Sequence, residues 1–211
     1  LDDYDNQSGY TGLDQHWARR IDLFSEGAYF GGGRDAAEGN VCEVQIEDVE
    51  RWISLQGAPK EVLEGLKTLN DRTVSYLWDL RRPSTEGYQP AFLHSIEELR
   101  QLQRFTAEEW EGGAAKPGLS DLLTVWGDPG DGLVNVNTTS SAVLQSLPDM
   151  KPEIAQKIVD LRNGPDGQPN TRDDVGFSSL AQMSSKLDVS AERLLGVSRY
   201  CKADSRFFTI K

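Results

Sequence analysis

The chain has little of the material from which redox, metal and hydrolytic sites are usually built. It contains two cysteines, Cys42 and Cys201, and two histidines, His16 and His94. No CxxC, HExxH, GxSxG or Walker pattern is present, and nothing in the spacing of the carboxylates sets two of them on one catalytic wall. We therefore expect no enzyme, and we expect each histidine at the surface or beside a helix cap.

Long apolar runs and excess positive charge are also missing. No run approaches the roughly 18 apolar residues that would suggest a membrane span. Lys and Arg number 22 against 34 Asp and Glu, and the resulting net charge of -12 repels a polyphosphate backbone. We expect a chain that is soluble as given, with one large domain or two small ones. Its start at Leu1, without Met, predicts that a signal or anchor upstream has been removed.

The two cysteines lie far apart, and each falls in a segment with the pattern of a strand. In an oxidising compartment Cys42 and Cys201 can form a disulfide that closes almost the whole chain. Two buried, apolar thiols fit the same sequence. Both interpretations stay open.

What the chain does contain is an internal duplication. Segment 53–81 aligns without a gap with segment 134–162, and both end in Asp-Leu-Arg. After loops of different length, 94–110 aligns with 178–194. Each copy has the pattern of four short helices, which are too short to be stable alone. We therefore expect each copy to fold as a compact module.

Helix start signals support this interpretation. In the second copy, Thr138 or Thr139 is expected to cap one helix, and Pro152 suits the first turn of the next. In the first copy, Thr106 with Glu109 fits the capping box, in which side chain and backbone satisfy each other's free groups.

Segments 42–53, 122–127 and 206–211 have the composition of strands, and Val44 and Ile46 alternate clearly onto one face of the first. We expect a small, mainly antiparallel sheet made of segments distant in sequence, with the helical copies packed on it. The predicted fold class is α+β.

Aromatic residues divide into two sets. Core packing is expected for the tryptophans at repeat or strand positions, namely Trp52, Trp78, Trp110 and Trp126. Trp17 and Tyr29 are the candidates for contact with a partner.

The loop 163–177 is the best candidate metal site. Its hard oxygen donors, which suit calcium rather than zinc, are Asp166, Asn170, Asp173 and Asp174. The spacing is not that of an EF-hand, and a solvated acidic loop fits it equally well. A second acidic group near the start of the chain either holds a cation or forms a solvated terminus. Its members are Asp2, Asp3, Asp5 and Asp14.

The second copy resembles a helix-hairpin-helix unit, or SAM-like unit, of the form VNINTA…L..LPGIG…A..I...R. In DNA-binding members of that class, hairpin glycines let backbone amides approach a phosphate closely. Here the hairpin 147–152 lacks both glycines, places Asp149 where the phosphate would sit, and loses one amide at Pro152. The packing motif is retained without the phosphate site. A nucleic-acid binder of the DNA-uptake type remains the alternative function.

Several motifs, in this order along the chain, resemble the general secretion pathway protein K family of type II secretion minor pseudopilins. The matching stretches are 2–18, 90–110, 122–138 and 205–211. The resemblance implies a pseudopilin-like α/β domain at 1–53 and 121–211, which includes the second helical repeat at about 134–197. It also implies an inserted α-helical domain at 54–120, which contains the first repeat.

The same resemblance implies a function and a location. It implies a non-catalytic subunit that assembles with the minor pseudopilins I and J at the tip of the pseudopilus, without nucleic acid. The chain would be the periplasmic part of a single-pass inner-membrane protein of a Gram-negative bacterium, whose N-terminal helix is removed here. A subunit too wide to accept another on top starts or ends a filament. Family members bind calcium, which favours calcium over the solvated-loop interpretation at Asp166 to Asp174.

Overall fold

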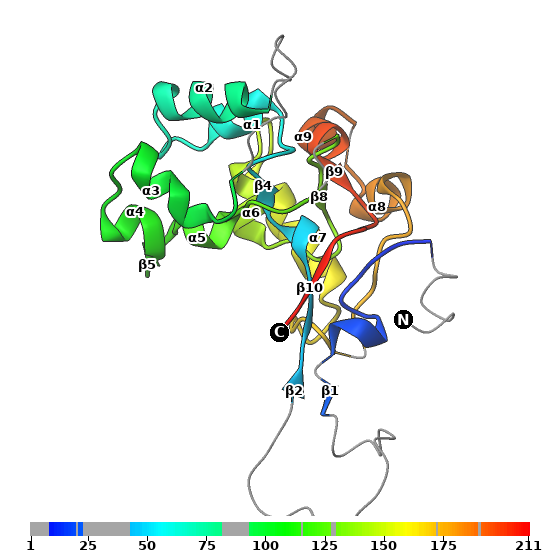
Figure 1. Ribbon diagram of the computed structural model, residues 1–211. Helices are drawn as coiled ribbons and strands as arrows, with labels where there is room; N and C mark the ends of the chain where they lie inside the picture. Colours follow the sequence, from blue (N-terminus) through cyan, green and yellow to red (C-terminus); the bar gives the residue numbers. More distant parts are fainter. Residues whose placement is uncertain are drawn as a thin grey trace, which may run out of the picture.

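The structure is a computed structural model, and it describes residues 9–19, 21–22, 43–81, 93–114, 116–127, 130–171, 173–189 and 191–211. Over these residues, short helices alternate with two-stranded sheets, as the α+β prediction expects (Figure 1). None of the described helices is long and apolar enough to cross a membrane.

A first group of helices lies between two strands that pair in parallel, β4 (Ile53–Ser54) and β7 (Leu123–Thr124). The group contains α1 (Lys60–Gly65), α2 (Asp71–Leu80), the 3-10 helix η4 (Ile96–Glu98), α3 (Leu99–Leu102), α4 (Ala107–Glu111) and α5 (Leu119–Leu122). Between α4 and α5 lies a small antiparallel pair, β5 (Gly112–Gly113) and β6 (Lys116–Pro117). The predicted capping box of Thr106 and Glu109 is confirmed at the start of α4.

A second group has the same arrangement, between the parallel strands β8 (Val134–Asn135) and β9 (Cys201–Lys202). It contains α6 (Ser141–Ser146), α7 (Pro152–Arg162), α8 (Leu180–Leu187), the 3-10 helix η5 (Ala191–Leu194) and α9 (Leu195–Tyr200). Pro152 opens α7, as predicted. In Figure 1 the first group is coloured cyan to green, and the second yellow to orange-red.

The two groups match in position as well as in order. Strands β4 and β8, helices α1 and α6, and helices α2 and α7 each begin at residues separated by the same number of positions, which is the offset of the sequence alignment. The register of the strand pairs also matches: Ile53 lies opposite Leu123, and Val134 lies opposite Cys201.

Two arginines, Arg162, which is buried, and Arg81, which is partly buried, make matched hydrogen bonds in the two groups. Arg162 donates from Nη1 to the carbonyls of Val136 (2.9 Å) and Thr139 (2.7 Å). Arg81, at the aligned position, donates to the aligned carbonyls of Leu55 and Ala58. Burial lowers the pKa of each arginine to about 10, which leaves both charged at neutral pH. Each guanidinium therefore ties the end of a long helix to the turn that follows the first strand of its group.

The prediction of one mainly antiparallel sheet is wrong. The described strands form five separate two-stranded sheets, and two of them are parallel because a helical crossover joins their strands. Antiparallel pairing joins β10 (Phe208–Ile210) to β3 (Ile46–Asp48), and β1 (Ile21–Asp22) to β2 (Glu43–Val44). The predicted strand 42–53 is interrupted by the 3-10 helix η3 (Val49–Arg51), because the Asp48 carboxylate caps it by accepting a hydrogen bond from the Glu50 N–H.

Both groups contribute to one hydrophobic core. Among its fully buried side chains are Leu63, Leu99, Leu144, Ile158 and Phe177.

Trp110 is buried as predicted, and Trp52 is partly buried against the core. Trp126 contradicts the core-packing prediction, because it follows the edge strand β7 and is 58% exposed.

Candidate functional site

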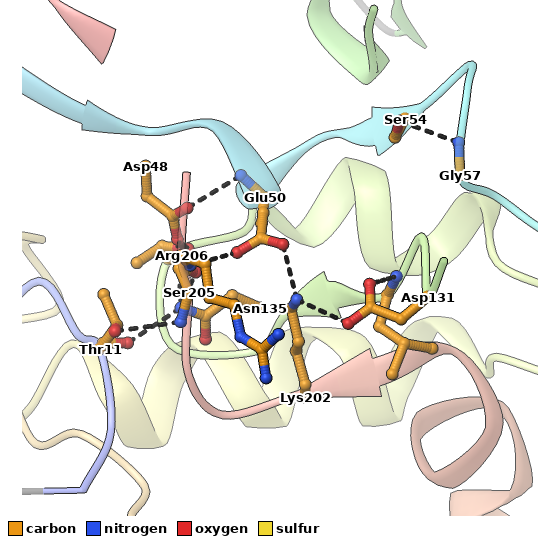
Figure 2. Close-up of polar contacts among 12 residues, drawn as sticks. Thr11, Asp48, Glu50, Ser54, Gly57, Asp131, Asn135, Lys202, Ser205 and Arg206 are labelled. Carbon is orange, nitrogen blue, oxygen red and sulfur yellow. Dashed lines mark hydrogen bonds and ion pairs between the residues drawn. The ribbon is translucent and has the colours of Figure 1, made fainter. Parts of the chain in front are cut away.

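A buried polar junction connects three segments that are distant in sequence (Figure 2). At its centre is Asp48, 1% exposed, at the end of β3. Its Oδ2 accepts hydrogen bonds from Asn135 Nδ2 (3.1 Å), Thr138 Oγ1 (2.5 Å) and Ser205 Oγ (2.7 Å), and its Oδ1 accepts one from the Glu50 N–H (2.8 Å). Burial raises the pKa of Asp48, and these four hydrogen bonds partly oppose that rise.

Asn135 brings the start of the described chain into the same junction. Its Nδ2 also donates to the Thr11 carbonyl (3.0 Å) and to Ser205 Oγ (2.8 Å). The Ser205 N–H donates to Thr11 Oγ1 (3.0 Å), and the Thr11 N–H donates to the Ala203 carbonyl (3.0 Å). Residues near 11, 48, 135 and 205 are therefore held together by one set of bonds.

Beside this cluster lies a buried ion pair whose cation comes from β9 (Figure 2). Lys202 Nζ lies 2.6 Å from Glu50 Oε1 and 3.0 Å from Asp131 Oδ2, and Glu50 Oε2 accepts from the Arg206 N–H (2.6 Å). Burial lowers the pKa of Lys202, but the hydrogen bonds and charges of Glu50 and Asp131 outweigh burial and leave that pKa raised. Lys202 is thus a cation that links the ends of three segments.

The junction explains why one predicted helix cap is wrong. Thr138 and Thr139 are fully buried and do not cap α6. Thr138 donates to Asp48, and Thr139 Oγ1 donates to the Arg51 carbonyl (2.8 Å). Ser140 caps α6 instead, by accepting from the Val143 N–H (3.2 Å).

The carboxylates of the acidic loop accept hydrogen bonds from N–H and O–H groups of the same loop. Asp174 Oδ2 accepts from the N–H groups of Asn170 (2.6 Å) and Thr171 (3.2 Å). Asp173 Oδ2 accepts from the Asp166 N–H (3.1 Å), and Asp173 Oδ1 accepts from Thr171 Oγ1 (2.8 Å). The bond from the Asp166 N–H and that from Thr171 lower the pKa of Asp173.

The structure brings the four predicted calcium residues into one loop, and within the described part of the chain it places no three His, Cys, Asp or Glu residues as a metal-binding group. Asp174 is nearly buried, and its charge acts on the adjacent Arg162, whose pKa it raises against the larger effect of burial. Calcium binding at this loop stays a prediction.

Other predicted residues have different environments. Trp17 is 5% exposed, its ring packs edge-on against Phe208 (5.1 Å between centroids), and its Nε1 donates to Gln15 Oε1 (2.7 Å). Its indole is part of the interior and offers almost no surface to a partner, contrary to the contact prediction. Tyr29 lies outside the described residues. His94 is exposed and precedes η4, as predicted.

Cys201 is buried, and burial raises the pKa of its thiol. It has no disulfide partner among the described residues, but Cys42 lies outside them, so the pairing stays a prediction. Of the second acidic group, Asp14 accepts a hydrogen bond from the Tyr10 hydroxyl (2.6 Å). Its other members, Asp2, Asp3 and Asp5, lie outside the described residues.

The hairpin between α6 and α7 carries a carboxylate at its turn. Asp149 adopts a left-handed conformation (φ 60°), and its Oδ2 lies 3.8 Å from Arg199 Nη1. Gly196 packs closely beneath the turn, where an added Cβ would lie 2.7 Å from the Pro148 carbonyl oxygen. A carboxylate paired with an arginine therefore stands at this turn. No observation favours the nucleic-acid alternative.

Fold and site together define the class: an α+β protein with two groups of short helices, each closed by a parallel strand pair, and a polar junction that connects distant segments. No protein-family model matches the chain, and a search of curated proteins finds no match. A search of solved structures finds a chain in the crystal structure of the GspK-GspI-GspJ complex from the enterotoxigenic Escherichia coli Type 2 Secretion System. The match has a TM-score of 0.55 and 16% identity, and covers 98% of this chain and 82% of the other. The chain has a GspK-like fold, which confirms the resemblance described from the sequence.

Proposed function

We propose that this protein is a minor pseudopilin of the GspK type, which assembles with partners of the GspI and GspJ types at the tip of a type II secretion pseudopilus. The observation that carries the proposal is the GspK-like fold over 98% of the chain. The crystal structure with that fold is a complex of GspK with GspI and GspJ from a secretion system. The proposal also includes a periplasmic location and a non-catalytic role.

The arrangement of helices supports a role that depends on shape. We interpret the two matched groups as duplicated helical repeats, with 54–120 as the inserted helical domain. The matched strand register and the matched bonds of Arg81 and Arg162 support this interpretation. A wide helical insert beside a helix-and-sheet domain would block the addition of a further subunit above it, so that the protein starts or caps the filament.

Complex formation tests this proposal directly. The chain should elute together with the soluble domains of the I- and J-type minor pseudopilins encoded in the same genome, at the mass of a 1:1:1 complex in light scattering. The variant Tyr76→Ala, which changes an exposed residue of α2, should assemble as well as the unmodified chain. Separate elution of the chain at about 50 µM would contradict the proposal. The DNA-binding alternative predicts instead a duplex-DNA affinity that falls steeply with salt.

Calcium binding is a second part of the proposal. We propose that the loop containing Asp166, Asn170, Asp173 and Asp174 binds one calcium ion through its carboxylate and carbonyl oxygens. Support comes from the loop geometry, in which carboxylates of Asp173 and Asp174 and the turns at Asn170 (φ 66°) and Gly167 (φ 68°) gather within one short segment.

Thermal unfolding measures the stabilisation that calcium binding at this loop should give. At 100 times the dissociation constant, calcium should add about 2.7 kcal/mol to the free energy of unfolding, which corresponds to a rise in Tm of about 5–10 °C. EDTA should reverse the rise, and Asp166→Asn should abolish it. Asp160→Asn, at an exposed residue of α7, is the matched control and should respond as the wild type does. A Tm that is the same in calcium and EDTA would contradict the proposal.

A further inference from the structure

The second pair of aligned segments is matched in the structure as well as in the sequence. The His94 N–H donates to Glu98 Oε1 (2.9 Å), and at the aligned positions the Ser178 N–H donates to Gln182 Oε1 (2.8 Å). The helices that follow in the two groups therefore begin in the same way. Side chains of one group can be compared with those at the aligned positions of the other.

In the first group, side chains from α3 and α4 meet over one indole ring. The Arg100 guanidinium lies 4.4 Å from the centre of the Trp110 ring. The ring of Phe105 packs against the same indole, with 5.5 Å between the ring centres. These contacts leave Trp110 only 5% exposed.

In the second group, smaller side chains stand where the first has this stacked pair. Ser184 is aligned with Arg100, and Leu194 is aligned with Trp110. Both line a groove of about 320 Å³ between α8 and the segment formed by η5 and α9. The other apolar side chains of its lining include Leu180, Met183, Leu195 and Val197. An open groove therefore lies where the first group has an indole stacked under a guanidinium.

The lining of this groove indicates what kind of ligand fits. None of the described residues that line it is charged, and Ala181, one of them, is aligned with Glu97 of the first group. Leu195 is 49% exposed, so water meets an apolar surface here. A charged ligand would lose hydration in the groove without gaining a counter-charge. The volume is at the lower end of the range for small-ligand pockets, about 300–1,000 Å³, and suits a single uncharged aromatic side chain.

We propose that the groove between α8 and α9 binds the indole of a tryptophan in an uncharged segment of a partner polypeptide. The indole occupies in the second group the place that the indole of Trp110 occupies in the first. The Ser184 hydroxyl supplies the acceptor that a buried indole N–H needs. Tryptophan is among the residues most enriched at the energetic centres of protein interfaces. This site lies on the second helical group and is additional to the proposed assembly with pseudopilins.

The probe for this site is N-acetyl-tryptophanamide, an uncharged tryptophan with a peptide bond on each side. In titrations of the ¹⁵N-labelled full chain, we expect saturable shifts of the Ser184, Leu194 and Leu195 amides, with a dissociation constant of roughly 1 mM. N-acetyl-alaninamide is the matched probe without the ring and should give no saturable shift. Indole-3-acetate carries the same ring with a carboxylate and should bind at least about tenfold more weakly.

Variants of the groove complete the test. Ser184→Arg combined with Leu194→Trp rebuilds the stacked pair of the first group and should abolish binding. Ser184→Arg alone changes a partly exposed residue, so the chain should stay folded, and binding should weaken at least about tenfold. Ser185→Arg is the matched control, because Ser185 is exposed on α8 and does not line the groove, and it should leave binding unchanged.

The proposal is overturned if the unmodified chain shows no saturable shifts, or if those shifts persist unchanged in Ser184→Arg. Self-association of the chain in light scattering that Trp126→Ala abolishes would also overturn it, because the groove would then hold an exposed tryptophan of a second copy. Because the titration uses the isolated chain, its failure would leave assembly with the pseudopilins untouched.

Discussion

Replacing Lys202 with methionine should lower the free energy of unfolding by about 3–5 kcal/mol. The change removes the cation from a buried cluster and leaves the carboxylates of Glu50 and Asp131 facing each other across the vacated position. Glu50 is 4% exposed, so its charge cannot be compensated by water. Loss of one partner of a buried pair costs far more than the pair itself contributes.

Urea unfolding of the full chain measures this change. Lys60→Met is the matched control, because Lys60 makes an exposed pair with Glu64 on α1 (3.2 Å), and its loss should cost less than about 0.5 kcal/mol. Adding Glu50→Gln to Lys202→Met should recover part of the lost stability, since it removes the unpaired charge. Equal, small effects of Lys202→Met and Lys60→Met would show that the buried cluster contributes nothing.

The sequence predicted the parts of this fold that depend on local signals. Pro152 opens a helix, and Thr106 with Glu109 forms a capping box, because both effects arise within one helical turn. The cap at Thr138 was wrong for the opposite reason. Its hydroxyl is used by Asp48, which lies 90 positions away, and neither the alternation of a strand nor the spacing of a cap contains that information.

The same limit applies to the junction as a candidate site. Asp48 and Glu50 continue the alternation of Val44 and Ile46, so from sequence alone they look like further residues of one strand. They are buried because their donors come from β9, from the residues after β8, and from the segment before β10. The duplication, by contrast, is visible in sequence, because the offset between its aligned segments is also the offset between the starts of β4 and β8.

Replacing Asp48 with alanine should lower the free energy of unfolding by about 3–5 kcal/mol. The change removes the acceptor of four hydrogen bonds, and each buried donor left without a partner costs about 1–3 kcal/mol. Asp48→Asn is the matched variant. Its amide oxygen can accept the three side-chain donors, and the Glu50 N–H alone then faces an NH₂ group, so we expect a loss of about 1–2 kcal/mol. Denaturant unfolding should therefore rank wild type, Asp48→Asn and Asp48→Ala in that order. Equal free energies of unfolding for Asp48→Asn and Asp48→Ala would show that the acceptor oxygen at residue 48 does not stabilise the fold.

The pH dependence of the same pair of proteins tests the charge of Asp48. Burial raises the pKa of Asp48 in the folded protein above its ordinary value of 3.8, so in the window between these two values the folded state binds more protons than the unfolded state. Its contribution to stability is then fully present below pH 3.8 and is lost as the pH rises through the raised pKa. The stability difference between wild type and Asp48→Asn, in which the other carboxylates cancel, should therefore grow in favour of wild type as the pH falls from 7 towards 4. A difference that shrinks over this range would mean that the four donors outweigh burial and hold the pKa of Asp48 below its ordinary value.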